Sequence, residues 1–473
     1  MRIAYILFTS IALVCCPAIA TTASAQTAPG GQATPAAPPP ATPADAAAPP
    51  KAPDAEKKPA APTEPFAFAD FSWVPGNAGA SERPLTWGPF TGEVRVDVDY
   101  NYSFNRPKDD TIGGSSEVFR HNEFQLTQLG FGGDFLYKNV QARIMTQFGM
   151  YSQTTPRNDA SPGRGQWNLA DAYRYISEGY GGYHIDALHG INIQAGIFMS
   201  YIGLWSYYNF DNWTYQPSYV SSNTPWFFNC MRLQIFVTDT LKIEPWLVDG
   251  WQSYGMFNQA PGGGGQILWR PTGWFSLVGN QYGGADTLGN PGRKRMHTDD
   301  SASFKYLDQP EWGLDKAAVS LTLDAGCESG GGVKCSNQYF LGFMAYNRFW
   351  FHHDVFGVTF GGGAITNPGR YLVLLPPING ATAVSGTPYF PENPGDKFKA
   401  WDAQLTFDYM PRPFITFRLE YNHRAANVPY FSGHGGVTPS GGNQGSPGSL
   451  VAGWQPDLVD SEDRVGAAML IKY

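Results

Sequence analysis

The sequence has little charge and, after its first segment, no long apolar run. Asp, Glu, Lys and Arg make up 15% of the 473 residues, whereas soluble domains have about 25%. From about residue 90 onwards no stretch reaches the roughly 18 apolar residues that a spanning helix needs. Aromatic residues are abundant instead, at 15%. An ordinary soluble domain and a helical membrane protein are therefore both disfavoured.

The sequence also lacks the motifs of common enzymes. It contains no GxSxG, no HExxH and no CxxC pattern. Residues 289–294 (GNPGRK) have only part of the spacing of a phosphate-binding loop. His352, His353 and Asp354 fall at a predicted turn, and adjacent residues on a strand point to opposite faces. We therefore expect no catalytic residue, no metal site and no cofactor. A lipid hydrolase stays as an alternative, but no Ser and His pair can be nominated for it.

The first residues resemble an export signal. Arg2 precedes an apolar stretch at 4–20, and Ala23-Ser24-Ala25 is a cleavage motif, so residues 1–25 are predicted to be a signal peptide. A lipoprotein signal is the alternative, because Cys15 and Cys16 end the apolar stretch, but Val14 does not suit lipid attachment. Residues 26–65 are rich in Ala and Pro and are predicted to be a disordered periplasmic segment. Residues 66–90 are then a lead-in to the folded part.

The folded part shows strict two-residue alternation. In 93–104 every second residue is apolar, and the residues between are charged or polar. The same pattern recurs in 140–150, 401–409 and 415–421, and apolar residues alternate at the end of the chain. Because successive side chains of a strand point to opposite faces, each strand has one apolar and one polar face.

About sixteen segments are predicted as strands, with connections that alternate between short and long. A soluble sandwich would also alternate, but short turns against long loops are typical of bacterial outer-membrane barrels. We therefore expect an all-β fold for residues 91–473, a single antiparallel transmembrane β-barrel of about sixteen strands with short periplasmic turns and long external loops. A barrel of that size encloses an aqueous channel. The predicted strands are 92–105, 121–137, 138–151, 168–184, 189–202, 226–237, 240–252, 264–271, 273–283, 299–307, 315–325, 337–350, 353–366, 398–410, 413–425 and 462–473.

Three stretches carry a family resemblance: Ala170–Tyr183, Gly190–Gly203 and Met231–Asn258. They resemble the OmpL-like family of bacterial β-barrel porins, and the resemblance extends over most of the barrel region. Because the matching motifs are strands and turns, the resemblance implies fold and compartment more than substrate. Tyr473, an aromatic final residue, resembles the signal that the barrel insertion machinery of the outer membrane reads.

Polar residues on the alternating strands are predicted to line the pore. They comprise five acids and four arginines, which predicts a weak cation preference that fades at high salt. The predicted lining residues are Arg95, Asp97, Asp99, Arg143, Asp402, Asp408, Arg418, Glu420 and Arg464.

The third long connection, about 203–225, is rich in aromatic and polar residues. Two interpretations stay open: the loop narrows the lumen and contacts solutes, or its rings pack at the barrel mouth or in the interfacial belt. Cys327 and Cys335 share an expected external loop and are predicted to form a disulfide, and Cys230 is expected to be a buried small residue. The candidates for a constriction are Trp205, Tyr207, Tyr208, Asp211, Trp213 and Tyr215.

Together these features predict an outer-membrane porin of a Gram-negative bacterium, with passive diffusion of small polar solutes and ions and no enzymatic activity. A substrate-selective channel for carbohydrates and a non-transport structural or adhesin barrel are the alternatives. The expected partners are outer-membrane lipid, the insertion machinery and the solutes, without nucleic acid. Three copies could associate as a homotrimer.

Overall fold

The computed structural model describes residues 64–77, 84–369 except Ser116 and Trp312, Tyr371, 397–435 and 457–473. All of them belong to one compact unit, Ala61–Tyr473. The predicted signal peptide and all of the predicted disordered segment except Glu64 and Pro65 lie outside the described residues. No helix in these described ranges is long and apolar enough to cross a membrane.

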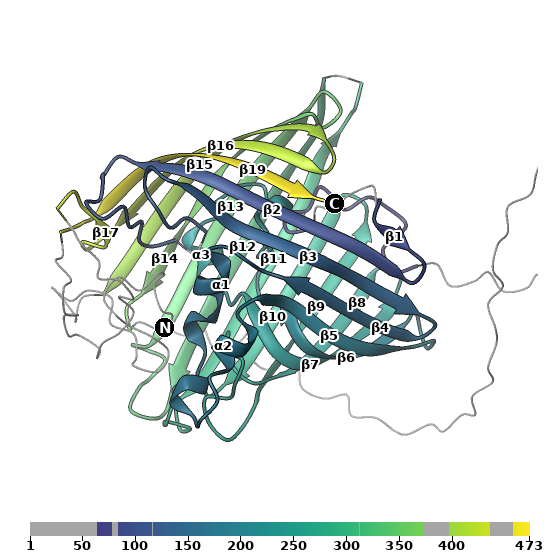
Figure 1. Ribbon diagram of the computed structural model, residues 1–473, viewed down its shortest axis with the longest axis horizontal. Helices are drawn as coiled ribbons and strands as arrows, with labels where there is room; N and C mark the ends of the chain where they lie inside the picture. Colours follow the sequence, from purple (N-terminus) through teal and green to yellow (C-terminus); the bar gives the residue numbers. More distant parts are fainter. Residues whose placement is uncertain are drawn as a thin grey trace, which may run out of the picture. The chain divides into compact units, whose positions relative to one another are not determined.

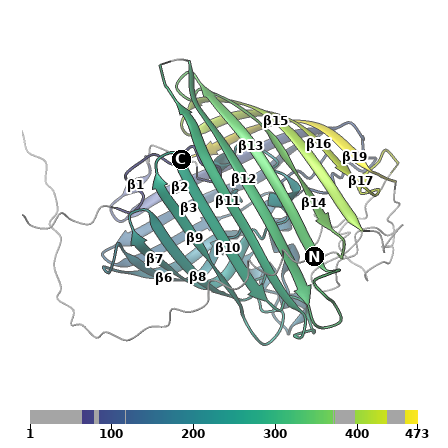
Figure 2. The same cartoon turned by 180° about the vertical axis from the view of Figure 1, so that it is seen from behind.

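Sixteen antiparallel strands form a closed ring (Figures 1 and 2). Each strand pairs with the next along the chain, and the last strand, β19, pairs with the first strand of the ring, β2, so the predicted barrel is confirmed. The strands of the ring are Phe90–Ser103 (β2), Phe124–Tyr137 (β3), Val140–Thr146 (β4), Ile176–Ile185 (β5), Ile191–Met199 (β6), Phe227–Thr238 (β7), Leu241–Val248 (β8), Gly262–Thr272 (β9), Phe275–Gly284 (β10), Lys294–Asp308 (β11), Leu314–Ser329 (β12), Tyr339–Phe351 (β13), Phe356–Asn367 (β14), Phe398–Arg412 (β15), Ile415–Ala426 (β16) and Ser461–Lys472 (β19).

The remaining elements are short. A two-residue strand (β1) pairs with the start of β2, and two more (β17 and β18) pair with each other. The helices lie in the long connections that follow β4 and β6. These elements are Thr86–Trp87 (β1), Phe431–Ser432 (β17), Leu458–Val459 (β18), Tyr151–Thr154 (α1), Leu169–Tyr173 (α2), Tyr219–Ser222 (α3) and the 3-10 turns Thr155–Asn158 (η1), Ser161–Gly163 (η2) and Asn209–Asp211 (η3).

Burial in the ring is the reverse of that in a soluble protein. On β15, Asp402 and Asp408 are at most 3% exposed, whereas Leu405 is 54% exposed. The same inversion holds along β2, where the buried Asp97 and Asp99 alternate with the less buried Val96, Val98 and Tyr100. These strands thus present apolar residues outwards, where they would contact lipid, and polar residues to the lumen.

Short and long connections lie at opposite ends of the ring. The turns after β3, β7, β9 and β15 are tight, and we refer to this end as the periplasmic end because bacterial barrels have their short turns there. The long connections at the other end include 200–226, between β6 and β7.

One predicted strand is wrong in its first half. The segment 168–184 forms a strand only from Ile176, and helix α2 precedes it. The side chain of Asn168 accepts a hydrogen bond from the backbone amide of Asp171, so a local helix cap sets the backbone here. The cap satisfies the first turn of a helix, so the strand begins only after that helix.

The inverted burial predicts how charge on the outer face is tolerated. Leu405 lies at the centre of β15, so Leu405→Arg should lower the free energy of unfolding in lipid by about 2–4 kcal/mol, the usual cost near the midplane. Tyr409→Arg lies on the same face nearer the periplasmic end and should cost about 0–1 kcal/mol. Denaturant titration in lipid vesicles measures both, and equal losses would contradict the assigned faces.

Candidate pore and its constriction

The predicted lining residues lie on the inner face of the ring. Eight of the nine have at most 8% of their surface exposed, and the side chain of Arg143 is 10% exposed. Such low exposure differs from the prediction of side chains facing open water. These side chains of the inner wall are shielded from solvent by another part of the same chain.

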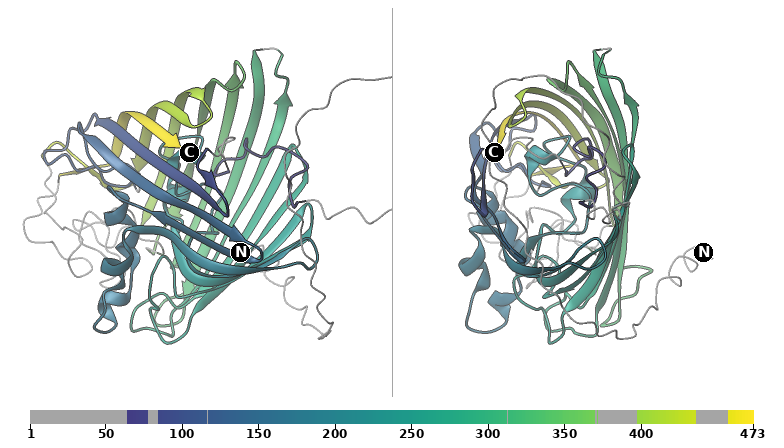
Figure 3. Two further views of the ribbon diagram at one scale, coloured as in Figure 1. Left: turned by 45° about the vertical axis from the view of Figure 1, so that its right-hand side comes forward. Right: turned by 90° about the vertical axis from the view of Figure 1, so that its right-hand side faces the viewer.

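The cover is the connection between β6 and β7, residues 200–226, which we call the inner loop. In the view along the ring, this teal part of the chain, with helix α3, lies inside the barrel wall (Figure 3, right). The predicted constriction residues Trp205, Tyr207, Tyr208, Asp211, Trp213 and Tyr215 are 3% to 7% exposed. The inner loop therefore occupies the lumen and narrows it.

Aromatic rings of the inner loop pack against each other and against the wall. The ring of Trp205 lies 4.7 Å from that of Tyr346 on β13, and Trp213 contacts Trp350 of the same strand edge to face at 5.6 Å. Tyr207 contacts Trp226 at the end of the loop at 5.0 Å. Rings packed in this way stabilise the loop by area and by their favoured geometry. Their faces are not open for stacking on a sugar.

Arginines of the wall hold the inner loop by its backbone. Arg418 on β16 donates hydrogen bonds to the carbonyl oxygens of Asn209, Asn212 and Thr214 at 2.8 to 3.2 Å. Arg348 donates to the carbonyl of Trp213 at 3.2 Å. Because an irregular loop cannot satisfy its own carbonyls, these guanidinium groups take the place of water.

Acidic side chains of the wall bind the hydrogen-bond donors of the loop. Glu420 accepts hydrogen bonds from the backbone amides of Tyr215 and Gln216 at 2.7 and 3.0 Å. Asp402 accepts from the amide of Tyr219 at 2.9 Å and from the hydroxyl of Ser218 at 2.8 Å. Two of the predicted lining acids thus bind the inner loop.

Asp408 and Asp211 each bind two cations. Asp408 lies 2.7 Å from both Arg348 and Arg418. Asp211 of the inner loop lies 3.1 Å from Arg95 on β2 and 2.9 Å from Lys472 on β19. The Asp408 pairs join three strands of the wall, whereas the Asp211 pairs fix the inner loop to the first and last strands of the ring.

Buried tyrosines of the loop act as neutral donors. The Tyr215 hydroxyl lies 3.0 Å from a carboxylate oxygen of Asp97, and the Tyr208 hydroxyl lies 2.8 Å from Glu178. Burial raises the pKa of both hydroxyls well above the ordinary value, with the neighbouring carboxylates adding to it. Both phenols therefore stay protonated and donate throughout the physiological pH range.

The sequence-based list missed several basic residues of the inner wall, and three of them contact the inner loop: Arg348, Arg424 and Lys472. Arg424 donates to the carbonyl of Pro217 at 2.9 Å. The alternation on β16 and β19, continued to the strand ends, places Arg424 and Lys472 on the polar face. Arg348 follows inward-facing Tyr346 on β13, where aromatic side chains replace polar ones and the alternation disappears.

A cavity of about 960 Å³ lies below the inner loop, at the periplasmic end. Its lining includes charged and aromatic side chains from the wall and from residues 64–77. Among them are Phe71, Trp73, Arg270, Lys316, Trp350 and Arg412. The lumen on this side thus has open volume and a mixed polar and aromatic lining, in contrast to the packed level of the inner loop.

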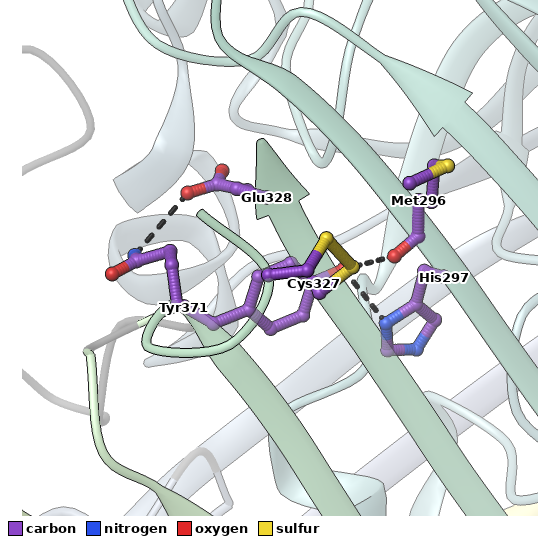
Figure 4. The surroundings of a disulfide bond; sticks show 7 residues. Met296, His297, Cys327, Glu328 and Tyr371 are labelled. Carbon is purple, nitrogen blue, oxygen red and sulfur yellow. Dashed lines mark hydrogen bonds between the residues drawn. A yellow bond between two sulfur atoms is a disulfide. The ribbon is translucent and has the colours of Figure 1, made fainter. Parts of the chain in front are cut away.

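Cys327 and Cys335 form a disulfide with their Cα atoms 5.0 Å apart. Cys327 belongs to the end of β12 and only Cys335 to the loop, so the bridge joins the loop to the strand. Nearby, the hydroxyl of Tyr371 lies 2.9 Å from His297 and donates to the carbonyl of Met296 at 3.2 Å (Figure 4).

The other single-residue predictions are placed as follows. Cys230 on β7 is half-buried and carries a free thiol. Tyr473 stacks on Phe414 with ring centres 4.9 Å apart. His352, His353 and Asp354 form the turn between β13 and β14. Within the described ranges, no group of three or more His, Cys, Asp or Glu residues could hold a metal ion.

A closed sixteen-stranded ring with a polar inner wall and an inner loop defines a transmembrane β-barrel of the porin class. The sequence matches a family over residues 89–446, and the chain belongs to it: "Putative beta-barrel porin-2, OmpL-like". The protein is therefore an outer-membrane β-barrel, as predicted. No curated protein matches the sequence significantly.

Several solved outer-membrane proteins resemble the chain. The anion-selective porin of Comamonas acidovorans has 11% identity and a TM-score of 0.47, over 81% of this chain and 99% of that chain. The channel DcaP of Acinetobacter baumannii has 13% identity and a TM-score of 0.45, over 81% and 97%. OmpT of Vibrio cholerae, folded in vitro, has 10% identity and a TM-score of 0.44, over 82% and 99%.

The contacts of Arg418 predict the effect of its removal. Arg418→Gln deletes the bonds to three loop carbonyls and one of the two cations on Asp408, so it should lower the free energy of unfolding by about 3–5 kcal/mol. Amide hydrogen exchange should accelerate in the inner loop. The control is Arg120→Gln, whose pair with Glu123 is 35% and 39% exposed and should contribute at most about 1 kcal/mol. Unchanged exchange in Arg418→Gln would contradict this anchoring.

We expect removal of the disulfide to affect stability only locally. Replacing Cys327 and Cys335 by Ser should cost at most about 2–3 kcal/mol because the bridged loop is short, and the strand content in circular dichroism should not change. Peptide mass mapping of untreated protein should recover the two cysteines linked. Alkylation of both thiols without prior reduction would show that the bridge does not form.

Proposed function

We propose that this barrel is a diffusion channel for small polar solutes and ions, exported to the outer membrane of a Gram-negative bacterium by a cleaved signal peptide. The single observation that carries the proposal is the polar inner wall, which continues below the inner loop as a cavity of about 960 Å³. A barrel built only as an anchor or adhesin would need no such volume inside it. Family membership over residues 89–446 supports the same function.

Selectivity in this proposal depends on width and on charge. The inner loop limits the width at the level of the wall charges, because its aromatic rings and backbone occupy much of the lumen there. Charge contributes weakly, because wall carboxylates such as Asp408 are neutralised by neighbouring arginines. The predicted set of five acids and four arginines is nearly balanced, so we expect at most a weak cation preference.

The alternative functions receive less support. A carbohydrate-selective channel would need aromatic faces open to the solute, and the rings of the inner loop are packed. An enzyme would need a nucleophile beside a base, and the inner wall instead carries charges that are already bound to the loop. Association into a homotrimer is compatible with a porin and stays part of the proposal.

The proposal is tested in planar bilayers and in liposomes. Purified protein should conduct ions, with a potassium-to-chloride permeability ratio within about threefold of unity in 0.1 M salt, approaching unity at 1 M as the screening length falls from about 10 Å to 3 Å. Liposome swelling should be fast for small sugars and slow for larger ones. A folded barrel that admits neither ions nor sugars would contradict the proposal, and a steep selectivity would contradict the paired charges.

A further inference from the structure

Residues 64–77, which precede the ring, lie inside it. Phe71, Trp73 and Val74 are 5%, 1% and 0% exposed, and they belong to the same buried cluster as wall residues and the inner loop. The sequence predicted only a lead-in for most of this stretch. We call residues 64–77 the inserted segment.

The inserted segment is held at the periplasmic end of the ring. The amide of Phe66 donates to the carbonyl of Asp239, in the turn between β7 and β8, at 2.8 Å. The indole of Trp73 donates to the carbonyl of Gly273, in the turn between β9 and β10, at 3.1 Å. The segment is thus attached to two neighbouring periplasmic turns.

At its other end the segment supports the inner loop from below. The indole of Trp213 donates to the carbonyl of Trp73 at 3.2 Å, and the amide of Gly76 donates to the carbonyl of Asp211 at 2.9 Å. Gly76 has a φ of +76°, and a Cβ atom there would lie 2.2 Å from the carbonyl oxygen of Leu204. Only glycine fits this approach between the two segments.

Arg270 on β9 is a wall residue that contacts two aromatic rings of the segment. Its guanidinium lies 4.5 Å from the ring centre of Phe71 and 5.5 Å from that of Phe66, and its Nε atom donates to Ser276 at 3.2 Å. Among the described residues, no carboxylate oxygen lies within 4.0 Å of it. This buried cation instead lies against the aromatic rings of Phe66 and Phe71, which both belong to the inserted segment.

We propose that the inserted segment is a removable stopper that limits the open width of the channel from the periplasmic side. It lies along the lumen between the periplasmic turns and the inner loop, and it borders the cavity of about 960 Å³. Its contacts are hydrogen bonds, aromatic packing and cation–π contacts, with no ion pair to the wall in the part of the chain that the structure describes. This inference rests on the proposed channel function.

A matched pair of arginine variants tests the stopper. Arg270 and Arg412 both line the cavity, but Arg412 ends β15, and its side chain donates, among the described residues, only to the carbonyl of the adjacent Pro411. Both Arg270→Gln and Arg412→Gln remove one positive charge. Single-channel recording should show at least about a twofold rise in mean conductance for Arg270→Gln, because a wider lumen carries more ions, and wild-type conductance for Arg412→Gln.

A reversible lock shows whether the segment itself causes that rise. A Cβ atom at Gly273 would lie 2.8 Å from the Cβ of Ala69, so Ala69→Cys with Gly273→Cys can form a disulfide after a small shift. In the Arg270→Gln background, oxidation should return conductance to the wild-type level, and reduction should raise it again. Arg270→Gln alone, with and without reductant, controls for reduction of the native disulfide.

The outcomes separate the stopper from the channel. Equal, non-zero conductance of Arg270→Gln and wild type, or a rise that persists when the segment is locked, would overturn the stopper while leaving the channel. No conductance in wild type and in every folded variant would overturn both the stopper and the channel. If Arg270→Gln does not fold, as judged by heat-modifiable migration in gels, Phe71→Ala removes the partner ring and takes its place under the same criteria.

Discussion

Polar groups inside a closed ring must be satisfied by the chain or by trapped water, and this constraint governs the lumen. The wall carries arginines and carboxylates, while the inner loop brings backbone carbonyls and amides that its irregular conformation leaves unpaired. Arg418 and Glu420 meet this need on adjacent inward positions of β16, one for carbonyls and the other for amides. The wall charges thus act first as a docking surface for the loop, and the remaining width follows from how deeply the loop sits.

Lipid outside the ring imposes the opposite constraint. Leu405 and Phe407 face outwards on the two sides of Thr406, which is fully buried on the inner face. Because each strand must satisfy lipid on one side and a charged lumen on the other, a shift of one residue in the register would reverse both faces. The continuous pairing around the ring and the inner loop therefore depend on the same alternation.

How much the sequence could predict depends on whether a feature is set by neighbouring residues or by contacts between residues far apart in the chain. Alternation is local, so it indicated the ring and the inward direction of residues such as Asp97 and Arg418. On β13 the inward side chains include Tyr346 and Trp350, and Arg348 between them could not be recognised from alternation. A local cap at Asn168 and Asp171 replaced the first half of a predicted strand by a helix. The insertion of residues 64–77 depends on contacts such as Trp73 with Gly273, which lie two hundred residues apart, and no local pattern carries such information.

The position of Asp211 has a consequence for assembly. Arg95 and Lys472, the two cations that it binds, are direct partners across the seam where the first and last strands of the ring meet. Like charges placed opposite each other on neighbouring strands repel, so the seam closes at a lower free energy when the inner loop has brought its carboxylate between them. The loop, in turn, acquires its two-cation site only once the seam has closed. Closure of the barrel and burial of the loop therefore favour each other, and a nascent barrel with an open seam would lack this anchor of the loop.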